Sequence, residues 1–205
     1  MSTPRSVSWL CLITLCLFYS CNDDVVRDYY PSEKIKSEVT FNKEGLQHGS
    51  ARFYYETGAL HEESEWKNGI REGKRLIYWE NRKLKESMNY LGDKLQGECK
   101  TFYENGNEET VAYFDSDIRN GSYREYHANG IVKVEGDFKK GLQHGSYIKY
   151  DEQGVRMEEI TFQFGRREGP YRLYDTRGEI VQELLYRNNE MVPEPEPDEG
   201  GNPVN

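Results

Sequence analysis

The sequence predicts an all-β protein, an elongated single-layer antiparallel β-meander of about six 24-residue hairpins. Three observations support this fold class: glycines recur every 24 residues, aromatic residues recur at fixed distances from them, and two turn signals divide each unit. One hairpin cannot bury enough apolar surface to fold alone, but stacked hairpins can, as in other repeat proteins. We call the first glycine of each unit position 0, and position n lies n residues later. The structural repeat glycines at position 0 are Gly49, Gly73, Gly97, Gly121, Gly145 and Gly169.

Two aromatic columns follow the same period. Aromatic residues make up 13% of the chain, yet all twelve of these positions are aromatic, so we expect them to pack against their equivalents in neighbouring units. The column at position 5 is Tyr54, Tyr78, Phe102, Tyr126, Tyr150 and Tyr174. The column at position 17 is Trp66, Tyr90, Phe114, Phe138, Phe162 and Tyr186.

Two turns separate two strands in each unit. One turn contains a glycine at position 9 in every unit except the second, which has Arg82, and the other lies just before position 0, as at Asn68-Gly69. Asparagine and glycine tolerate the positive φ that tight hairpin turns require. In the second strand, positions 11, 15 and 17 are mostly apolar and positions 12, 14 and 16 mostly polar, which predicts one buried and one solvated face.

The first strand has a less regular pattern. Its aromatic residues occupy position 5 but also position 2 in the later units, at Tyr123, Tyr147 and Tyr171. These two positions have opposite parity, so a regular strand would place them on opposite faces. Either a β-bulge or a partly covered second face accounts for the pattern.

The ends of the chain differ from the repeats. Residues 1–20 have a basic start and a short apolar run typical of a secretory signal. The segment Leu17-Phe18-Tyr19-Ser20-Cys21 resembles a bacterial lipobox, which implies lipidation of Cys21, with ordinary signal cleavage as the alternative. We expect a polar tether at 21–38, the repeat domain at 39–186, and a disordered acidic, proline-rich tail at 187–205. The anchor predicts a protein of the bacterial cell envelope, on the periplasmic or surface face of the outer membrane.

Charge and motif searches exclude several functions. The net charge of −9 opposes binding to nucleic acid, and we expect membrane contact through the lipid anchor only. Adjacent acids such as Glu62 and Glu63 point to opposite faces of a strand, so they do not form an acid/base pair. His48 and His144 have no metal-ligand spacing, and Cys99 is interpreted as a small core residue. The sequence therefore predicts no enzyme, no cofactor and no metal site.

One surface suggests binding. Tyr55, Trp79 and Tyr103 each follow the position-5 aromatic directly, so we expect them on the opposite face. Tyrosine and tryptophan supply large contact areas at low entropic cost, and these three residues form a candidate binding patch. Half-buried packing between units is the alternative interpretation.

The repeat itself resembles a known family. The stretch from Lys139 to Tyr147, then Tyr150 and Gly154, is similar to the MORN repeat variant found in the YwqK-type antitoxin family. The resemblance implies a repeat scaffold used for binding, and some members are antitoxins that neutralise a cognate toxin. The leading hypothesis is thus a non-enzymatic protein-binding module whose partner is another protein. The alternative is a structural or adhesive surface lipoprotein that binds cell-wall or environmental glycan.

Overall fold

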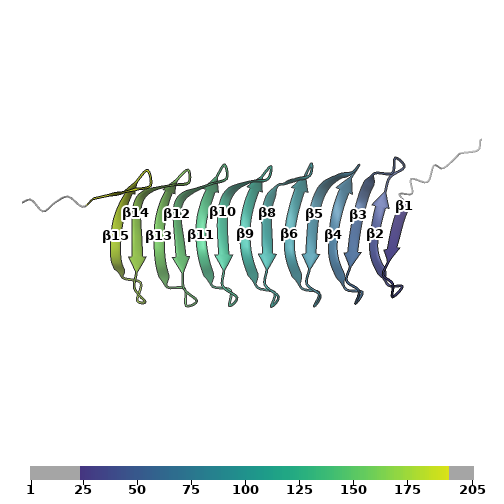
Figure 1. The fold of residues 1–205 in the computed structure, drawn as a ribbon, viewed down its shortest axis with the longest axis horizontal. Coiled ribbons are helices and arrows are strands. Elements are labelled where there is room, and N and C mark those ends of the chain that lie inside the picture. The colour runs from purple at the N-terminus through teal and green to yellow at the C-terminus, as the bar shows by residue number, and fades with distance from the viewer. Residues whose placement is uncertain (1–23, 194–205) are drawn as a thin grey trace, which may run out of the picture.

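The computed structural model describes residues 24–193, which form one open antiparallel sheet (Figure 1). Neighbouring strands follow chain order from β1 to β16, and only the two-residue strand β7 lies off this path, paired with β6. The described residues contain no helix, so none is long and apolar enough to cross a membrane. The predicted fold class, an elongated single-layer β-meander, is confirmed.

The strands are similar in length along the whole sheet. The first half contains β1 (Asp24–Tyr29), β2 (Ile35–Phe41), β3 (Gln47–Tyr54), β4 (Leu60–Lys67), β5 (Ile70–Tyr78), β6 (Leu84–Leu91), β7 (Lys94–Leu95) and β8 (Gly97–Phe102). The second half contains β9 (Glu108–Asp115), β10 (Ile118–Tyr126), β11 (Val132–Lys139), β12 (Leu142–Tyr150), β13 (Arg156–Gln163), β14 (Arg166–Tyr174), β15 (Ile180–Arg187) and β16 (Glu190–Val192).

The repeat array begins earlier than the sequence analysis predicts. Residues 24–38, assigned there to a polar tether, form β1 and the start of β2, a complete hairpin that precedes the six predicted ones. The hairpin turn after Tyr30 has the same backbone hydrogen bonds as the turn after Tyr55. These two residues are 25 positions apart, because the connection around Gly45 has one extra residue. That insertion shifts the first hairpin out of the 24-residue register and conceals it.

The array also ends later than predicted. Residues from Arg187 onward, assigned to a disordered tail, include β16, which pairs with the end of β15. The amide of Asn189 donates to the carbonyl of Arg167, as the amide of Gly165 does to Gln143 one unit earlier. Residues 188–192 therefore form the start of a further unit, which the structure describes as far as Pro193. The signal segment 1–20, Cys21 and residues 194–205 lie outside the described residues.

The turn chemistry explains the glycine columns. All six glycines at position 0 have positive φ, between 80° and 119°. The five glycines at position 9 also have positive φ, and Arg82 adopts the same conformation with a φ of 68°. Side chains other than glycine are disfavoured in this left-handed region, so the 24-residue glycine pattern is a backbone requirement.

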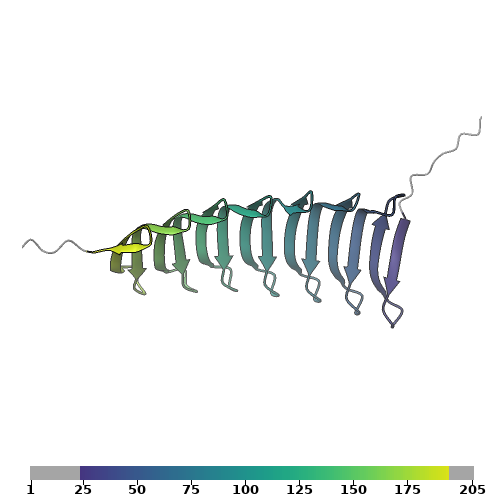
Figure 2. The ribbon, with the colours of Figure 1, turned by 45° about the horizontal axis from the view of Figure 1, so that its top comes forward.

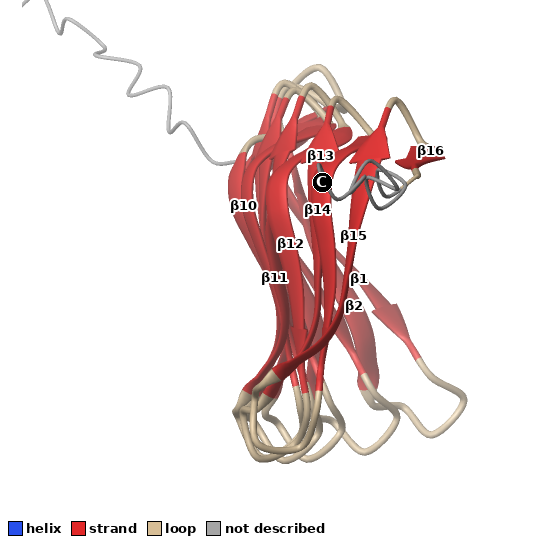
Figure 3. Cartoon of the chain, turned by 90° about the vertical axis from the view of Figure 1, so that its left-hand side faces the viewer, coloured by secondary structure: helices blue, strands red, loops and turns tan. Residues whose placement is uncertain are grey.

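Two irregularities in each unit bend the sheet. The strand register shifts just before position 5, as between Phe53 and Tyr54, and again near position 17, as between Ser64 and Trp66. Viewed along the long axis, the strands are curved instead of straight (Figure 3). The turns that precede position 0 form a staggered row along one edge of the sheet (Figure 2). Bulges increase local twist. The extra residue before position 5 lies in the second strand, as at His61, so the first strand alternates regularly and places position 2 and position 5 on different faces.

The core is thin, as expected of a single layer. The buried apolar side chains are small or branched, and none of the large side chains described is fully buried. The buried apolar residues are Ala51, Ala59, Ile77, Ala112, Val134 and Ile160. Most packing is between half-buried aromatic residues of neighbouring strands, so both faces of the sheet are accessible to ligands.

Candidate interaction surface

The predicted patch residues lie in the turns at one edge of the sheet. The Tyr55 hydroxyl donates to the carbonyl of Tyr78 at 2.8 Å, and the Tyr103 hydroxyl donates to the carbonyl of Tyr126 at 2.7 Å. The Trp79 indole Nε1 donates to the carbonyl of Phe102 at 3.2 Å. Each side chain therefore joins its own turn to the strand end of the next unit.

This column is longer than the sequence analysis recognised. Tyr30 donates to the carbonyl of Tyr54, and a ring nitrogen of His127 lies 3.1 Å from the carbonyl of Tyr150. The acceptor in each bond is a backbone carbonyl oxygen, which every residue type has. The sequence therefore contains no signal for these bonds. We call the set Tyr30, Tyr55, Trp79, Tyr103 and His127 the edge ladder.

The edge ladder still exposes part of its ring surface. Trp79 and Tyr103 line a hollow together with Lys85 and Phe102. The Lys85 ammonium lies 4.5 Å from the centre of the Trp79 ring, a cation–π distance. Tyr55 instead contacts His61 edge-on at 4.6 Å. The structure thus brings together two of the three predicted patch residues around one hollow.

A second aromatic surface occupies the C-terminal half of the sheet. Tyr123 contacts Phe138 edge-on, with 5.8 Å between ring centres. The following two units repeat this contact: the distance is 6.1 Å from Tyr147 to Phe162 and 6.1 Å from Tyr171 to Tyr186. Position 2 and position 17 therefore share one face in these units. We call these three tyrosines, with the three rings they contact, the aromatic stripe.

Close approach within the stripe depends on a glycine. A Cβ atom at Gly136 would lie 2.6 Å from the Tyr147 ring, so only glycine leaves room for that ring. The equivalent residues in the neighbouring units are Ala112 and Ile160. The Tyr147 ring thereby lies close to the backbone of β11.

Arginines cover one end of the stripe. The Arg119 guanidinium lies 5.0 Å from the centre of the Tyr123 ring and 4.8 Å from the Phe138 ring. Arg71 and Arg167 occupy the same repeat position and lie 4.5 Å from Tyr90 and 5.2 Å from Tyr186. The Arg119 Nε is buried without a hydrogen-bond partner, so ring contact replaces hydrogen bonding for this atom. This column was not predicted, although arginine stands two residues before position 0 in three of the six predicted units, at 71, 119 and 167.

The stripe is uncharged at neutral pH. Burial raises the pKa of the Tyr123 and Tyr147 phenols, with a smaller contribution from the nearby Glu125 carboxylate. Both hydroxyls therefore remain protonated and able to donate hydrogen bonds. Half-buried, neutral phenols with a polar tip are common at protein interfaces.

The opposite face has a different pattern. The Tyr78 hydroxyl donates to Glu63 at 2.7 Å, and the Tyr150 hydroxyl donates to Glu135 at 2.6 Å. Tyr54–Glu38 and Tyr174–Glu159 repeat the contact. Glutamate at position 14 is thus paired with tyrosine at position 5 of the next unit. We call this side of the sheet the tyrosine–glutamate face.

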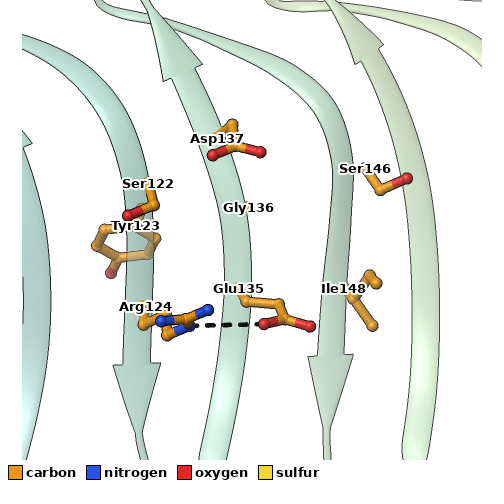
Figure 4. A pocket seen from close by; sticks show the side chains of 8 residues that line it. All are labelled: Ser122, Tyr123, Arg124, Glu135, Gly136, Asp137, Ser146 and Ile148. Atoms are coloured by element: carbon orange, nitrogen blue, oxygen red, sulfur yellow. Dashed lines mark ion pairs between the residues drawn. The ribbon is translucent and has the colours of Figure 1, made fainter.

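A shallow hollow lies on the tyrosine–glutamate face. Figure 4 shows Ser122, Arg124, Glu135, Asp137 and Ser146 around it, with the Arg124–Glu135 ion pair at 3.6 Å. Both charges are substantially exposed, so the pair adds little stability. Its residues are the ordinary surface side chains of three consecutive strands.

Residues with reactive side chains do not converge. Glu62 bonds Arg75 while Glu63 bonds Tyr78, so the adjacent acids point to opposite faces as expected. Burial raises the pKa of the half-buried Cys99 thiol, which keeps it protonated. Within residues 24–193, no group of three or more His, Cys, Asp or Glu side chains is placed to hold a metal ion.

Comparison with known proteins agrees with this geometry. The MORN repeat variant matches five segments of the chain: 25–43, 47–68, 95–107, 119–140 and 167–188. These five segments are similar to MORN-type repeats. The first match covers the hairpin of β1 and β2, which the sequence analysis left outside the repeat domain. No curated protein matches the chain. The MORN repeats indicate a repeat-based binding protein.

Proposed function

We propose that this chain is a non-enzymatic binding protein whose aromatic stripe binds a protein partner. The observation that supports this is the row of tyrosines at Tyr123, Tyr147 and Tyr171 on a single-layer sheet. Within the described residues, no second layer covers these rings. Tyrosine and arginine are the residues that most often dominate the binding energy of protein interfaces.

The charges beside the stripe fit a protein partner better than a polyanion. Arg119 and Lys149 lie near the Tyr147 phenol, and so do Glu125 and Glu158. A mixed set of charges favours specific orientation of a folded or extended protein, whereas nucleic acid would require a cationic surface. A cognate toxin, neutralised as in the antitoxin family that the repeat resembles, is the partner class we consider first.

A surface glycan is the second candidate ligand. The observation that favours it is the hollow lined by Trp79 and Tyr103, where aromatic rings and the Glu86 and Glu109 carboxylates lie together. Concave sites with aromatic walls and a few polar groups are typical of small-ligand binding. In this alternative the edge ladder, not the aromatic stripe, is the adhesive surface.

Capture experiments separate the two candidates. The full chain in detergent serves as bait in native envelope extract and on immobilised cell-wall glycan, beside two triple variants. The stripe variant carries alanine at 123, 147 and 171, which is the residue found at position 2 of an earlier unit, at Ala51. The edge variant carries alanine at 55, 79 and 103, and circular dichroism verifies that both variants are folded.

The proposal expects a stoichiometric protein captured by the wild type and the edge variant but not by the stripe variant. Glycan retention lost only in the edge variant would instead establish the adhesive alternative. Equal protein capture by all three chains would remove the stripe as the binding site.

We further propose that Cys21 is lipidated and holds the protein at the bacterial envelope. The support is the lipobox-like segment that ends at Cys21. Labelling of the wild type with a radioactive fatty acid, lost in Cys21→Ser, is the expected result. A Cys21→Ser chain that still accepts the label or fractionates fully with membranes would contradict the anchor.

A further inference from the structure

Both ends of the sheet present unpaired strands. β1 pairs only with β2, so its outer edge has no strand beside it among the described residues. At the other end, β16 covers only residues 185–187 of β15, and within residues 24–193 no strand pairs with the outer edge of residues 180–184. Val26 is 52% exposed and Val181 is 64% exposed, so apolar side chains accompany both free edges.

Neither edge strand is very short or contains the proline or lysine that commonly prevents pairing, although each has one register irregularity, at Asp28/Tyr29 in β1 and at Val181 in β15. Native edge strands are commonly very short, interrupted by proline or bulges, or lined with lysine. β1 has six residues and β15 has eight, and neither contains proline or lysine. After β15, the next proline in the chain is Pro193, directly after β16, where the next strand of the array would continue.

The two free edges belong to strands that pair with each other inside the repeat array. β1 is the first strand of a unit and β15 is the second strand of one, and everywhere inside the array a second strand pairs with the next first strand. From these observations we infer that β1 of one copy pairs with the open segment of β15 in another copy, which joins the chains head to tail through one continuous sheet.

The register of this contact follows from β13 and β14. There Glu158, Glu159 and Ile160 pair with Leu173, Arg172 and Tyr171. One unit later the same positions of β15 are Gln182, Glu183 and Leu184. The equivalent positions of β1 are Asp28, Arg27 and Val26, as the pairing of Arg27 with Glu38 and of Arg172 with Glu183 establishes.

Side chains match across the contact in this register. Glu183 lies opposite Arg27 of the second copy, and Leu184 lies opposite its Val26. Inside the chain, the same two positions form the Arg172–Glu159 ion pair at 3.6 Å. Tyr29 of the second copy also reaches Glu183, in the way that Tyr174 donates to Glu159. Tyr29 is 57% exposed, and this contact supplies the glutamate partner that other tyrosines of its column have.

The outer edge of β15 also has room for β1 of a second copy. β16 occupies the part of the next unit that precedes position 0, ending at Val192. β1 of the second copy begins with Asp24 at position 0, so the strand residues of β16 and β1 follow one another beside β15, and Pro193 has to leave the sheet where β1 begins. Because the two surfaces differ and lie at opposite ends of the sheet, association does not close and produces linear assemblies (Figure 1).

The test is sedimentation velocity of the full chain over a wide concentration range, with two charge-reversal variants. Arg27→Glu places two acids opposite each other at the contact, and Glu183→Arg places two bases there. Each variant alone is expected to associate about tenfold more weakly than the wild type. An equimolar mixture restores association, because each variant then offers the other an opposite charge at both ends, and the double variant restores it in one chain.

Arg52→Glu is the matched control. Arg52 occupies the same repeat position as Arg27 and has a similar ion pair, with Glu63, but lies inside the array. Its reversal is expected to leave association unchanged, and circular dichroism verifies that all variants are folded. A wild type that stays monomeric at every concentration would overturn the inference. Association of Arg27→Glu and Glu183→Arg as strong as that of the wild type would also overturn it.

Discussion

Arg82 is a residue whose substitution by glycine we expect to stabilise the fold. It occupies position 9, where the other five predicted units have glycine, and its φ of 68° lies in the left-handed region. A non-glycine residue in this conformation costs about 1–2 kcal/mol. Replacing the arginine with glycine removes this cost. Glycine also lowers the stability by about 0.4–1 kcal/mol, because it has more conformational freedom in the unfolded chain. Arg82→Gly is therefore expected to raise the free energy of unfolding by about 0.5–1 kcal/mol.

Two further variants isolate the backbone effect. Arg82→Ala removes the exposed side chain but retains the strained φ, so it should leave the free energy of unfolding nearly unchanged. Gly58→Ala creates the strain at the equivalent turn of another unit, where a Cβ atom meets nothing within 4 Å. Its expected cost is about 1–2 kcal/mol, from φ alone.

Urea denaturation followed by circular dichroism measures all three variants. The reasoning is wrong if Arg82→Gly destabilises the protein, or if Arg82→Ala stabilises it as much as glycine does. In the second case the arginine side chain, and not the backbone, would be the source of the strain.

Three other changes test the packing. Burial and the Glu63 bond raise the pKa of Tyr78 to about 12, so the stabilisation by its protonated hydroxyl is complete below pH 10 and lost as the pH rises through 12. Tyr78→Phe should remove about 1–2 kcal/mol of that pH-dependent stability, measured by urea denaturation across this pH range. Phe138→Ala deletes the ring that contacts Tyr123 and Arg119 and should cost about 3 kcal/mol in urea denaturation, and an unchanged midpoint would contradict a stacked aromatic core. Tyr103→Phe deletes the bond to the Tyr126 carbonyl and should cost about 1 kcal/mol, measured in the same way; no loss would mean that the edge ladder does not stabilise the array.

The regular part of the fold follows from the sequence because it depends on local chemistry. A glycine at position 0 is needed for positive φ, and a fixed turn length keeps the aromatic columns aligned. The hairpin of β1 and β2 was missed because one added residue near Gly45 changes the spacing to 25. The start of β16 was missed because Asn188-Asn189 forms the turn without glycine, using two residues that tolerate positive φ.

The face assignment required the structure. Position 2 and position 5 have opposite parity in a regular strand, and sequence alone left open whether a bulge or a second covered face explains this. The register shift before position 5 occurs in every predicted unit, for example between Lys149 and Tyr150. Both faces are in fact used: Tyr147 packs on Phe162 on one side, and Tyr150 donates to Glu135 on the other. Hydrogen bonds from the edge ladder to backbone carbonyls were not predictable, because no residue type marks the acceptor.

The two halves of the sheet place their extra aromatic residues differently, and this decides where a partner should bind. In the first three predicted units the extra aromatic is at position 6, in the edge ladder, and position 2 holds Ala51, Arg75 or Cys99. In the last three units position 2 is tyrosine and position 6 is polar, so the aromatic surface moves from the turn edge to the sheet face. The polar atoms of Tyr55, Trp79 and Tyr103 form hydrogen bonds within the chain. The Tyr147 hydroxyl donates no hydrogen bond within residues 24–193, so it is available to a partner. A footprint confined to the C-terminal half of the sheet is therefore the binding mode that best fits the distribution of aromatic side chains.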